Sequence, residues 1–266
     1  MPPELYFALT LIVKMAVTAA FVVAATVTAE RAGPVIGGMV ATLPIGAGPV
    51  YVFLAMDHDA HFIAQSAVMS LAINAANATF AVVYSLLAQH RSLIVSLCGA
   101  FLVWTVFALI IRSAAWDFPA AAVMNAVVLA LCSWSARSLR HVRMPAFRAR
   151  FTDLLVRAAM VSVLVGVVVT FSFQLGPRGS GLLAVFPVVL TSIVLVMHPR
   201  VGGKAAAAVL ANAPIGLVGF AFACAVLHFS AEPLGNPAGL ALALAMSVGW
   251  SLLMMLTHRP PPPELT

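Results

Sequence analysis

The sequence predicts an all-α integral membrane protein with about nine transmembrane helices, arranged as two inverted-topology four-helix repeats joined by one central helix. Three observations carry this prediction: the composition, a series of apolar windows and an internal repeat. Of the 266 residues, 63% are hydrophobic and 8% are charged, and this charged share is about a third of that in an average soluble domain. A soluble fold cannot bury so much apolar surface, so the composition excludes that class.

Nine apolar windows are long enough to cross a bilayer, which takes about 20 residues per helix. They cover residues 5–28, 33–55, 61–88, 92–111, 117–136, 152–173, 177–197, 203–229 and 237–257. The first window lacks the basic n-region of a secretory signal and exceeds the length of a cleavable apolar core. We therefore expect it to be retained as the first helix.

The distribution of basic residues predicts the orientation of the chain. Five arginines lie between the fifth and sixth windows, and short loops rich in Lys and Arg stay in the cytoplasm; they are Arg137, Arg140, Arg143, Arg148 and Arg150. With nine spans, the N-terminus is then outside and the C-terminus cytoplasmic, and ten basic residues fall in inside segments against two outside. Because the net charge of +6 follows this bias, we expect no nucleic-acid partner.

An internal repeat appears when the chain is shifted by 143 residues against itself. The shift aligns "GPVIGGMVATLPIGAGPV" (33–50) with "GPRGSGLLAVFPVV" (176–189), so that Pro44 meets Pro187, and it places Lys14 on Arg157. We predict a first four-helix repeat at 1–112, a central helix and basic loop at 113–150, a second repeat at 151–259 and a Pro-rich tail at 260–266. Four spans return the chain to its starting side, so the single central helix inverts the second repeat.

Small residues at spacing four form one face of each repeated segment. The two sets are Gly33, Gly37 and Ala41, and Gly176, Ser180 and Ala184. Such faces let helix backbones approach closely in lipid. We expect a packing seam between the second and seventh helices.

The prolines in the same segments predict interruptions near mid-membrane. Pro44 is followed by Gly46, Gly48 and Pro49, which predicts a break with a second half-helix starting near Pro49. Pro187 is followed by valines and a leucine, which predicts a kink without a break. A substrate or ion site at residues 44–49 opposite Pro187 is one interpretation; a structural hinge is the other.

Polar and charged residues inside the windows supply the remaining candidates for a substrate site. Lys14 and Arg157 are the only charges well within predicted helices, and each is open to an anion-binding role or to snorkelling toward the surface. The amides of Asn74, Asn77, Asn125 and Asn212 should point inward. They either make interhelical hydrogen bonds or line a polar pathway.

The string "DHDAH" (57–61), expected on the outer side of the membrane between the second and third helices, is the most enzyme-like motif. Asp57, His58, Asp59 and His61 have ligand types that suit a divalent metal, but Asp59 is also a good N-cap for the third helix, and we expect no metal. Asp153 similarly suits a capping role at the start of the sixth helix. The sequence has none of the hydrolase or phosphate-loop motifs, so we expect neither an enzyme nor a cofactor.

The segments "GGMVATLPIG" and "SGLLAVFPVV", each preceded by a helix with one embedded charge, resemble the GlpM-type small inner-membrane proteins. The resemblance covers about 100 residues in each half. It implies a bacterial inner-membrane protein built from two such units, and the central helix and basic loop depart from that pattern.

Together these patterns favour a small bacterial inner-membrane secondary transporter or permease-like protein, with a midplane site between inverted repeats for a small molecule of anionic class. The alternative is a non-transporting integral membrane scaffold or accessory protein for envelope biosynthesis. Membrane lipids and a small-molecule or ion substrate are the expected partners, with a homodimer left open.

Overall fold

The computed structural model describes residues 3–31, 46–140 and 150–257, and every regular element in these ranges is helical. The helices are α1 (Pro3–Arg31), α3 (Ala47–Asp57), α4 (Ala60–Leu87), α5 (Leu93–Ser113), α6 (Phe118–Ser135), α7 (Phe151–Ala184), α8 (Val188–Val201), α9 (Gly203–Ala211), α10 (Ala213–Leu234) and α11 (Asn236–Thr257), with a 3-10 turn at Arg137–Leu139. Seven helical stretches are long and apolar enough to cross a membrane. This confirms a multi-pass α-helical membrane protein.

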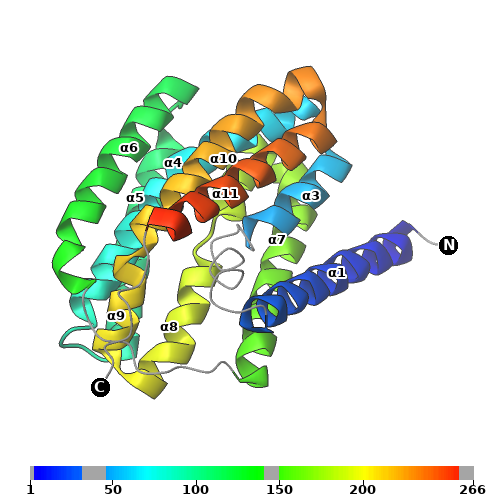
Figure 1. Cartoon of the computed structure of the whole chain (residues 1–266). Coiled ribbons are helices and arrows are strands. Elements are labelled where there is room, and N and C mark those ends of the chain that lie inside the picture. Colours follow the sequence, from blue (N-terminus) through cyan, green and yellow to red (C-terminus); the bar gives the residue numbers. More distant parts are fainter. Residues whose placement is uncertain (1–2, 32–45, 141–149, 258–266) are drawn as a thin grey trace.

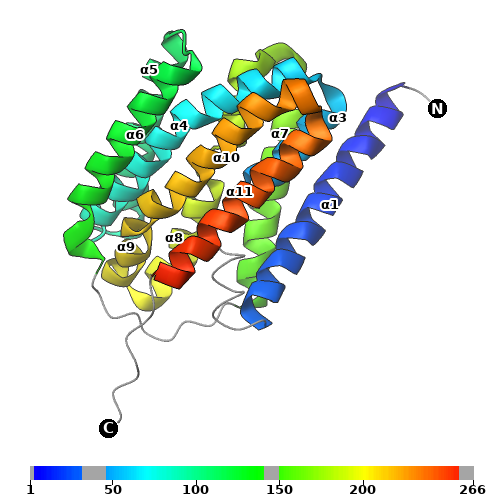
Figure 2. The ribbon, with the colours of Figure 1, turned by 45° about the horizontal axis from the view of Figure 1, so that its top comes forward.

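The centre of the bundle is α4, which contacts α5, α6, α7, α9 and α10. Its side chains are buried along nearly its whole length, including Phe80 and Tyr84. Figures 1 and 2 place α1 and α6 at opposite margins of the bundle, with α1 against α7 and with α10 and α11 side by side. The apolar side chains that α1, α5 and α6 expose, such as Ile12, Ile94 and Val123, form the surface suited to lipid.

The nine predicted windows correspond to the observed helices with three differences, one of which is that the eighth window is divided at Asn212 into α9 and α10. Residues 33–45 of the second window lie outside the described residues, and the rest of that window forms α3. The boundary between the sixth and seventh windows lies inside α7, which changes direction at Gly176, and the seventh window is divided between the end of α7 and α8. The count of nine spans therefore stays a prediction.

The helix α7 changes direction at Gly176, whose backbone has φ 63° and ψ −175°. Only glycine adopts this left-handed extended conformation without strain. Pro177 follows, where its fixed φ and missing N–H suit the first position of a new helical segment. A short helix of eight residues, 177–184, thus packs back toward the bundle before the chain reaches α8.

The prediction of a kink without a break at Pro187 is wrong. The helical conformation ends at Ala184, residues 185–187 are irregular, and α8 begins at Val188. The valines that follow Pro187 favoured a continuous helix in the sequence pattern, but the carbonyl of Val185 finds a partner on α4. The second half of the chain therefore contains an interrupted helix.

The small residues of 177–184 pack against α4. Ser180, Gly181 and Ala184 are buried, and a Cβ atom on Gly181 would collide with the backbone carbonyl of Ser66. The partner surface is thus α4. Gly33, Gly37 and Ala41, the other half of the predicted seam, lie outside the described residues.

Candidate functional site

The first turns of α3 and α8 lie next to each other inside the bundle. Gly46 is the N-cap of α3, and a Cβ atom on it would lie 3.2 Å from Cγ2 of Val189 in the first turn of α8. The predicted half-helix start near Pro49 is confirmed within two residues, because α3 begins at Ala47. Gly46 offers no side chain to cap the free N–H groups of this turn. Pro44 lies outside the described residues.

Side chains of α4 and of α8 itself satisfy two carbonyls in the irregular segment 185–187. Nδ2 of Asn77 donates to the carbonyl oxygen of Val185 at 2.7 Å, and Nε1 of Trp104 donates to Oδ1 of Asn77 at 2.7 Å. Oγ1 of Thr191 donates to the carbonyl oxygen of Pro187 at 2.6 Å. Irregular backbone within a bilayer requires such internal partners, so Asn77 is a structural support of this site.

A second chain of hydrogen bonds links α3, α4 and the 177–184 segment. The Ser70 hydroxyl donates to the carbonyl oxygen of Gly181 at 2.7 Å. The Tyr51 hydroxyl must then donate to Oγ of Ser70, which lies 2.7 Å away. Tyr51, Ser70 and Gly181 are all buried. Hydrogen bonds through Ser70 of α4 therefore join α3 to the 177–184 segment.

The other predicted amides lie away from the interruptions. Nδ2 of Asn74 donates to Oδ1 of Asn125 at 3.1 Å and to the carbonyl oxygen of Leu217 at 3.0 Å. For Asn74 and Asn125 these contacts confirm the prediction of inward-pointing amides that make interhelical hydrogen bonds. For Asn212 the prediction of an inward-pointing amide is wrong. This residue is the C-cap of α9, its side chain is exposed, and its Nδ2 donates to the carbonyl oxygen of Ala208 within α9.

Lys14 is buried with its charge paired. Its side chain is 8% exposed, and Nζ donates to both carboxylate oxygens of Asp57, at 2.8 and 2.6 Å. The ammonium also lies 5.7 Å from the ring centroid of Phe53, within cation–π range. Lys14 can meet an anionic ligand only by exchanging Asp57 for it.

A second ion pair stands at the other end of the bundle. The guanidinium of Arg200, at the end of α8, donates to both oxygens of Asp153, each at 2.6 Å. Asp153 also accepts from the backbone N–H of Arg150 at 2.7 Å, which confirms its capping role at the start of α7. Arg157, one turn later, is half-buried.

The residues of "DHDAH" have separate partners. Asp57 pairs with Lys14, His61 bonds Glu232 at 2.8 Å, and Oδ1 of Asp59 accepts from the N–H of Phe62 at 2.8 Å, which confirms Asp59 as an N-cap. Among the described residues no group of three or more His, Cys, Asp or Glu side chains converges on a metal position.

His58 ties this outer turn to α7. Its ring stacks on Phe62, and Nε2 lies 2.8 Å from Oγ of Ser172. The Ser172 hydroxyl donates to the carbonyl of Val169, so the imidazole N–H donates to Ser172. Burial lowers the pKa of His58, partly opposed by Asp57 and Asp59, so the ring is neutral at pH 7.

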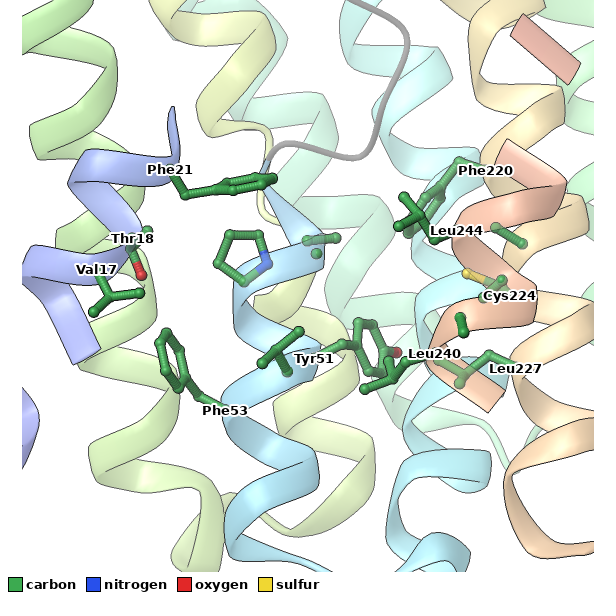
Figure 3. Close-up of a pocket in the computed structure, with 17 residues that line it drawn as sticks. Val17, Thr18, Phe21, Tyr51, Phe53, Phe220, Cys224, Leu227, Leu240 and Leu244 are labelled. Atoms are coloured by element: carbon green, nitrogen blue, oxygen red, sulfur yellow. The ribbon is translucent and has the colours of Figure 1, made fainter. Parts of the chain in front are cut away.

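A cavity of about 360 Å³ opens beside the first turn of α3. Figure 3 shows α1 side chains on one side, α3 side chains in the middle and α10 and α11 side chains on the other. Its lining includes Phe21, Gly48, Pro49, Tyr51 and Leu244 and is almost entirely apolar. Two predicted site residues, Gly48 and Pro49, therefore border a cavity within the size range of small-molecule sites.

The structure brings together part of the predicted set. Five predicted residues lie around the adjacent starts of α3 and α8: Gly46, Gly48, Pro49, Asn77 and Pro187. Lys14 instead lies at the other end of α3, beside Asp57, and Asn212 lies at the end of α9. Sequence reasoning missed Tyr51, Ser70 and Trp104, because a single hydroxyl or indole in an apolar helix carries no spacing signal.

No family model, curated protein or solved structure matches this chain. The resemblance of each half to GlpM-type proteins accordingly stays a prediction.

Proposed function

We propose that the protein is a secondary transporter of the bacterial inner membrane, which moves a small molecule along the interface between two inverted repeats. The observation that carries the proposal is that two short helices, α3 and α8, begin side by side inside the bundle, at Gly46 and Val189. Broken helices that meet near the midplane form the substrate and ion sites of many secondary transporters.

The bounds of the helices support the repeat. A shift of 143 residues carries the start of α4, Ala60, onto Gly203, the start of α9, and the start of α5, Leu93, onto Asn236, the start of α11. It also carries α3 onto α8 within three residues at either end. Equivalent helices contact each other, α1 with α7 and α4 with α10, and α3 contacts α11 as α8 contacts α5.

Hydrogen bonds between α4 and α9–α10 support the inversion. Oγ of Ser85 donates to the carbonyl of Ala207 at 3.0 Å, and Nδ1 of His228 lies 3.0 Å from the carbonyl oxygen of Ala64. The same 143-residue shift converts the first pair into the second. Between them Asn74 bonds Leu217, its own equivalent. Reciprocal contacts of this kind between antiparallel helices are expected when a two-fold axis across the bundle relates the two halves of the chain.

The length of α3 supports a midplane position for its first turn. The 11 residues of α3 span about 16 Å at about 1.5 Å per residue, which is about half of a hydrocarbon core of about 30 Å. Because α3 ends at Asp57 beside the outer turn, its first turn lies near the midplane. Its free N–H groups carry the positive end of the helix dipole. We infer an anionic substrate group that accepts from the free N–H groups of this turn, while Lys14 stays paired with Asp57 at the other end of α3.

A single cysteine at Gly48 tests transport against a fixed scaffold. A side chain there meets no atom within 4 Å, and the position borders the cavity. With Cys98, Cys132 and Cys224 replaced, a charged, membrane-impermeant thiol reagent is applied to intact cells and to inverted vesicles. Alternating access predicts labelling of Gly48→Cys from both sides, because the midplane opens to each side in turn.

The matched control is Gly249→Cys in α11, where a side chain also meets no atom within 4 Å but the position is exposed on the lipid-facing surface. We expect no labelling there. Labelling of Gly48→Cys from one side only, or from neither, would contradict transport and favour the scaffold or accessory role in envelope biosynthesis.

A further inference from the structure

A second cavity, of about 450 Å³, lies between α4, α6 and α10, apart from the interrupted helices. Its lining includes Leu71 from α4, Phe118 and Asn125 from α6, and Val218 and Phe222 from α10. Figure 2 shows α6 at the margin of the bundle opposite α1, and half of the residues of α6 are exposed. A molecule dissolved in the bilayer can therefore reach this cavity.

Asn125 is the polar group of this cavity whose orientation the structure fixes. The side chain is 2% exposed. Nδ2 of Asn74 donates to the carbonyl of Leu217, and a carbonyl can only accept, so the Asn74 amide has one orientation. The same Nδ2 donates to Asn125, so the atom of Asn125 that faces it must be Oδ1. Nδ2 of Asn125 is left at the other end of its amide.

This amide donor has no partner among the described residues. Its two N–H groups are available in a cavity whose other lining residues are apolar except for Ser133, and none of the lining side chains is charged. A buried donor without a partner costs about 1–3 kcal/mol, and a ligand that accepts a hydrogen bond removes that cost. A charged ligand would find no counter-ion among the lining residues, so the complementary molecule is neutral.

The depth of Asn125 narrows the class of ligand. Asn125 is seven residues beyond Phe118, the first residue of α6, or about 10 Å along the helix, inside the hydrocarbon core. The ester carbonyls of phospholipids lie in the interfacial region above that depth. Two aromatic side chains, Phe118 and Phe222, border the cavity and suit a planar ring.

We propose that this cavity binds a neutral, lipophilic carbonyl compound of the quinone type, with a carbonyl oxygen accepting from Nδ2 of Asn125. The site goes beyond the proposed transport function and does not depend on it, because it shares no lining residue with the cavity beside α3.

Decylubiquinone is a suitable probe, titrated against the purified full-length protein in nanodiscs, with binding followed by quenching of tryptophan fluorescence. We expect saturable binding to the wild type and about 5- to 10-fold weaker binding to Asn125→Leu, which has a similar size but lacks the donor. Asn212→Leu, at an exposed position outside the cavity, should bind like the wild type. Decylbenzene, which lacks carbonyls, should compete with decylubiquinone only weakly, and to the same extent in the wild type, Asn125→Leu and Asn212→Leu.

Ala122→Phe provides a test that leaves the amide pair intact, because it fills the cavity with a ring from its own lining. It should abolish saturable binding even if Asn125→Leu does not fold. Equal affinity of decylubiquinone for Asn125→Leu and the wild type, or unchanged binding to Ala122→Phe, would overturn the proposal.

Discussion

At the scale of single residues, the ion pair of Lys14 and Asp57 explains how a cation is tolerated within an apolar helix. A lone charge at that position costs about 2.5–3.5 kcal/mol on insertion scales, and the bidentate contact with Asp57 offsets it. The pair also fixes the end of α3 to α1. The buried charge therefore determines where the half-helix ends.

Replacing Lys14 with Met should destabilise the protein by about 2 kcal/mol, because Asp57 keeps a poorly solvated carboxylate without a counter-ion. Unfolding in mixed micelles of dodecyl maltoside and SDS would measure this change. The double variant Lys14→Met with Asp57→Asn should recover most of the loss, because it removes both charges.

Lys204→Met is the control for this pair, because Lys204 is exposed at the start of α9, and its effect should stay within about 0.5 kcal/mol. If the double variant is no more stable than Lys14→Met, the uncompensated carboxylate is not the cause of the loss.

At the scale of elements, the contact of the 177–184 segment with α4 depends on a glycine. A Cβ atom on Gly181 has no space beside the Ser66 carbonyl, whereas one on Gly48 meets nothing within 4 Å. Both residues lie within helical segments. Replacing each glycine with alanine therefore separates the effect of close packing on stability from the effect of the low helix propensity of glycine.

Gly181→Ala should lower stability by about 1–3 kcal/mol, because α4 and the segment must move apart. Gly48→Ala should be neutral or stabilising by up to about 1 kcal/mol, because alanine favours helices over glycine. Thermal unfolding in detergent compares the two variants directly. Equal stability of both would show that the close approach contributes nothing.

The starts of α3 and α8 also show what local sequence can predict. The start of α3 was predictable because Gly46, Gly48 and Pro49 all disfavour continuous helix within a few residues. The break at Pro187 was not, because the carbonyl of Val185 is satisfied by Asn77, 108 residues earlier in the chain. Asn77 and Pro187 are each visible in the sequence, but their contact depends on how α4 packs.

At the scale of the whole molecule, composition and windows predicted the helical membrane class, and the shift of 143 residues predicted the equivalence of segments that the helix bounds support. The cavities were not predictable, because alanine, leucine and phenylalanine line them and also fill the core. The pairing of Lys14 with Asp57 was missed for a similar reason, since 43 residues separate them.

His61 and Lys204 are equivalent under the 143-residue shift and are both exposed, so they test the inversion directly. Single cysteines at these positions, without the three native cysteines, should react with an impermeant reagent from outside for His61→Cys and from inside for Lys204→Cys. If the two repeats are inverted, the starts of α4 and α9 lie on opposite sides of the membrane, and the two cysteines must react from opposite sides. Reaction of both from the same side would contradict the inverted arrangement.

The bend at Gly176 has a consequence for membrane insertion during synthesis. The helical stretch Phe151–Val201 has 51 residues and would extend about 76 Å if straight, more than twice the hydrocarbon core. The growing chain must therefore turn back within it, and Gly176, with φ 63°, is the residue whose backbone permits that turn. All later helices, from α8 to α11, follow this turn in the chain, so the direction in which they enter the bilayer depends on it.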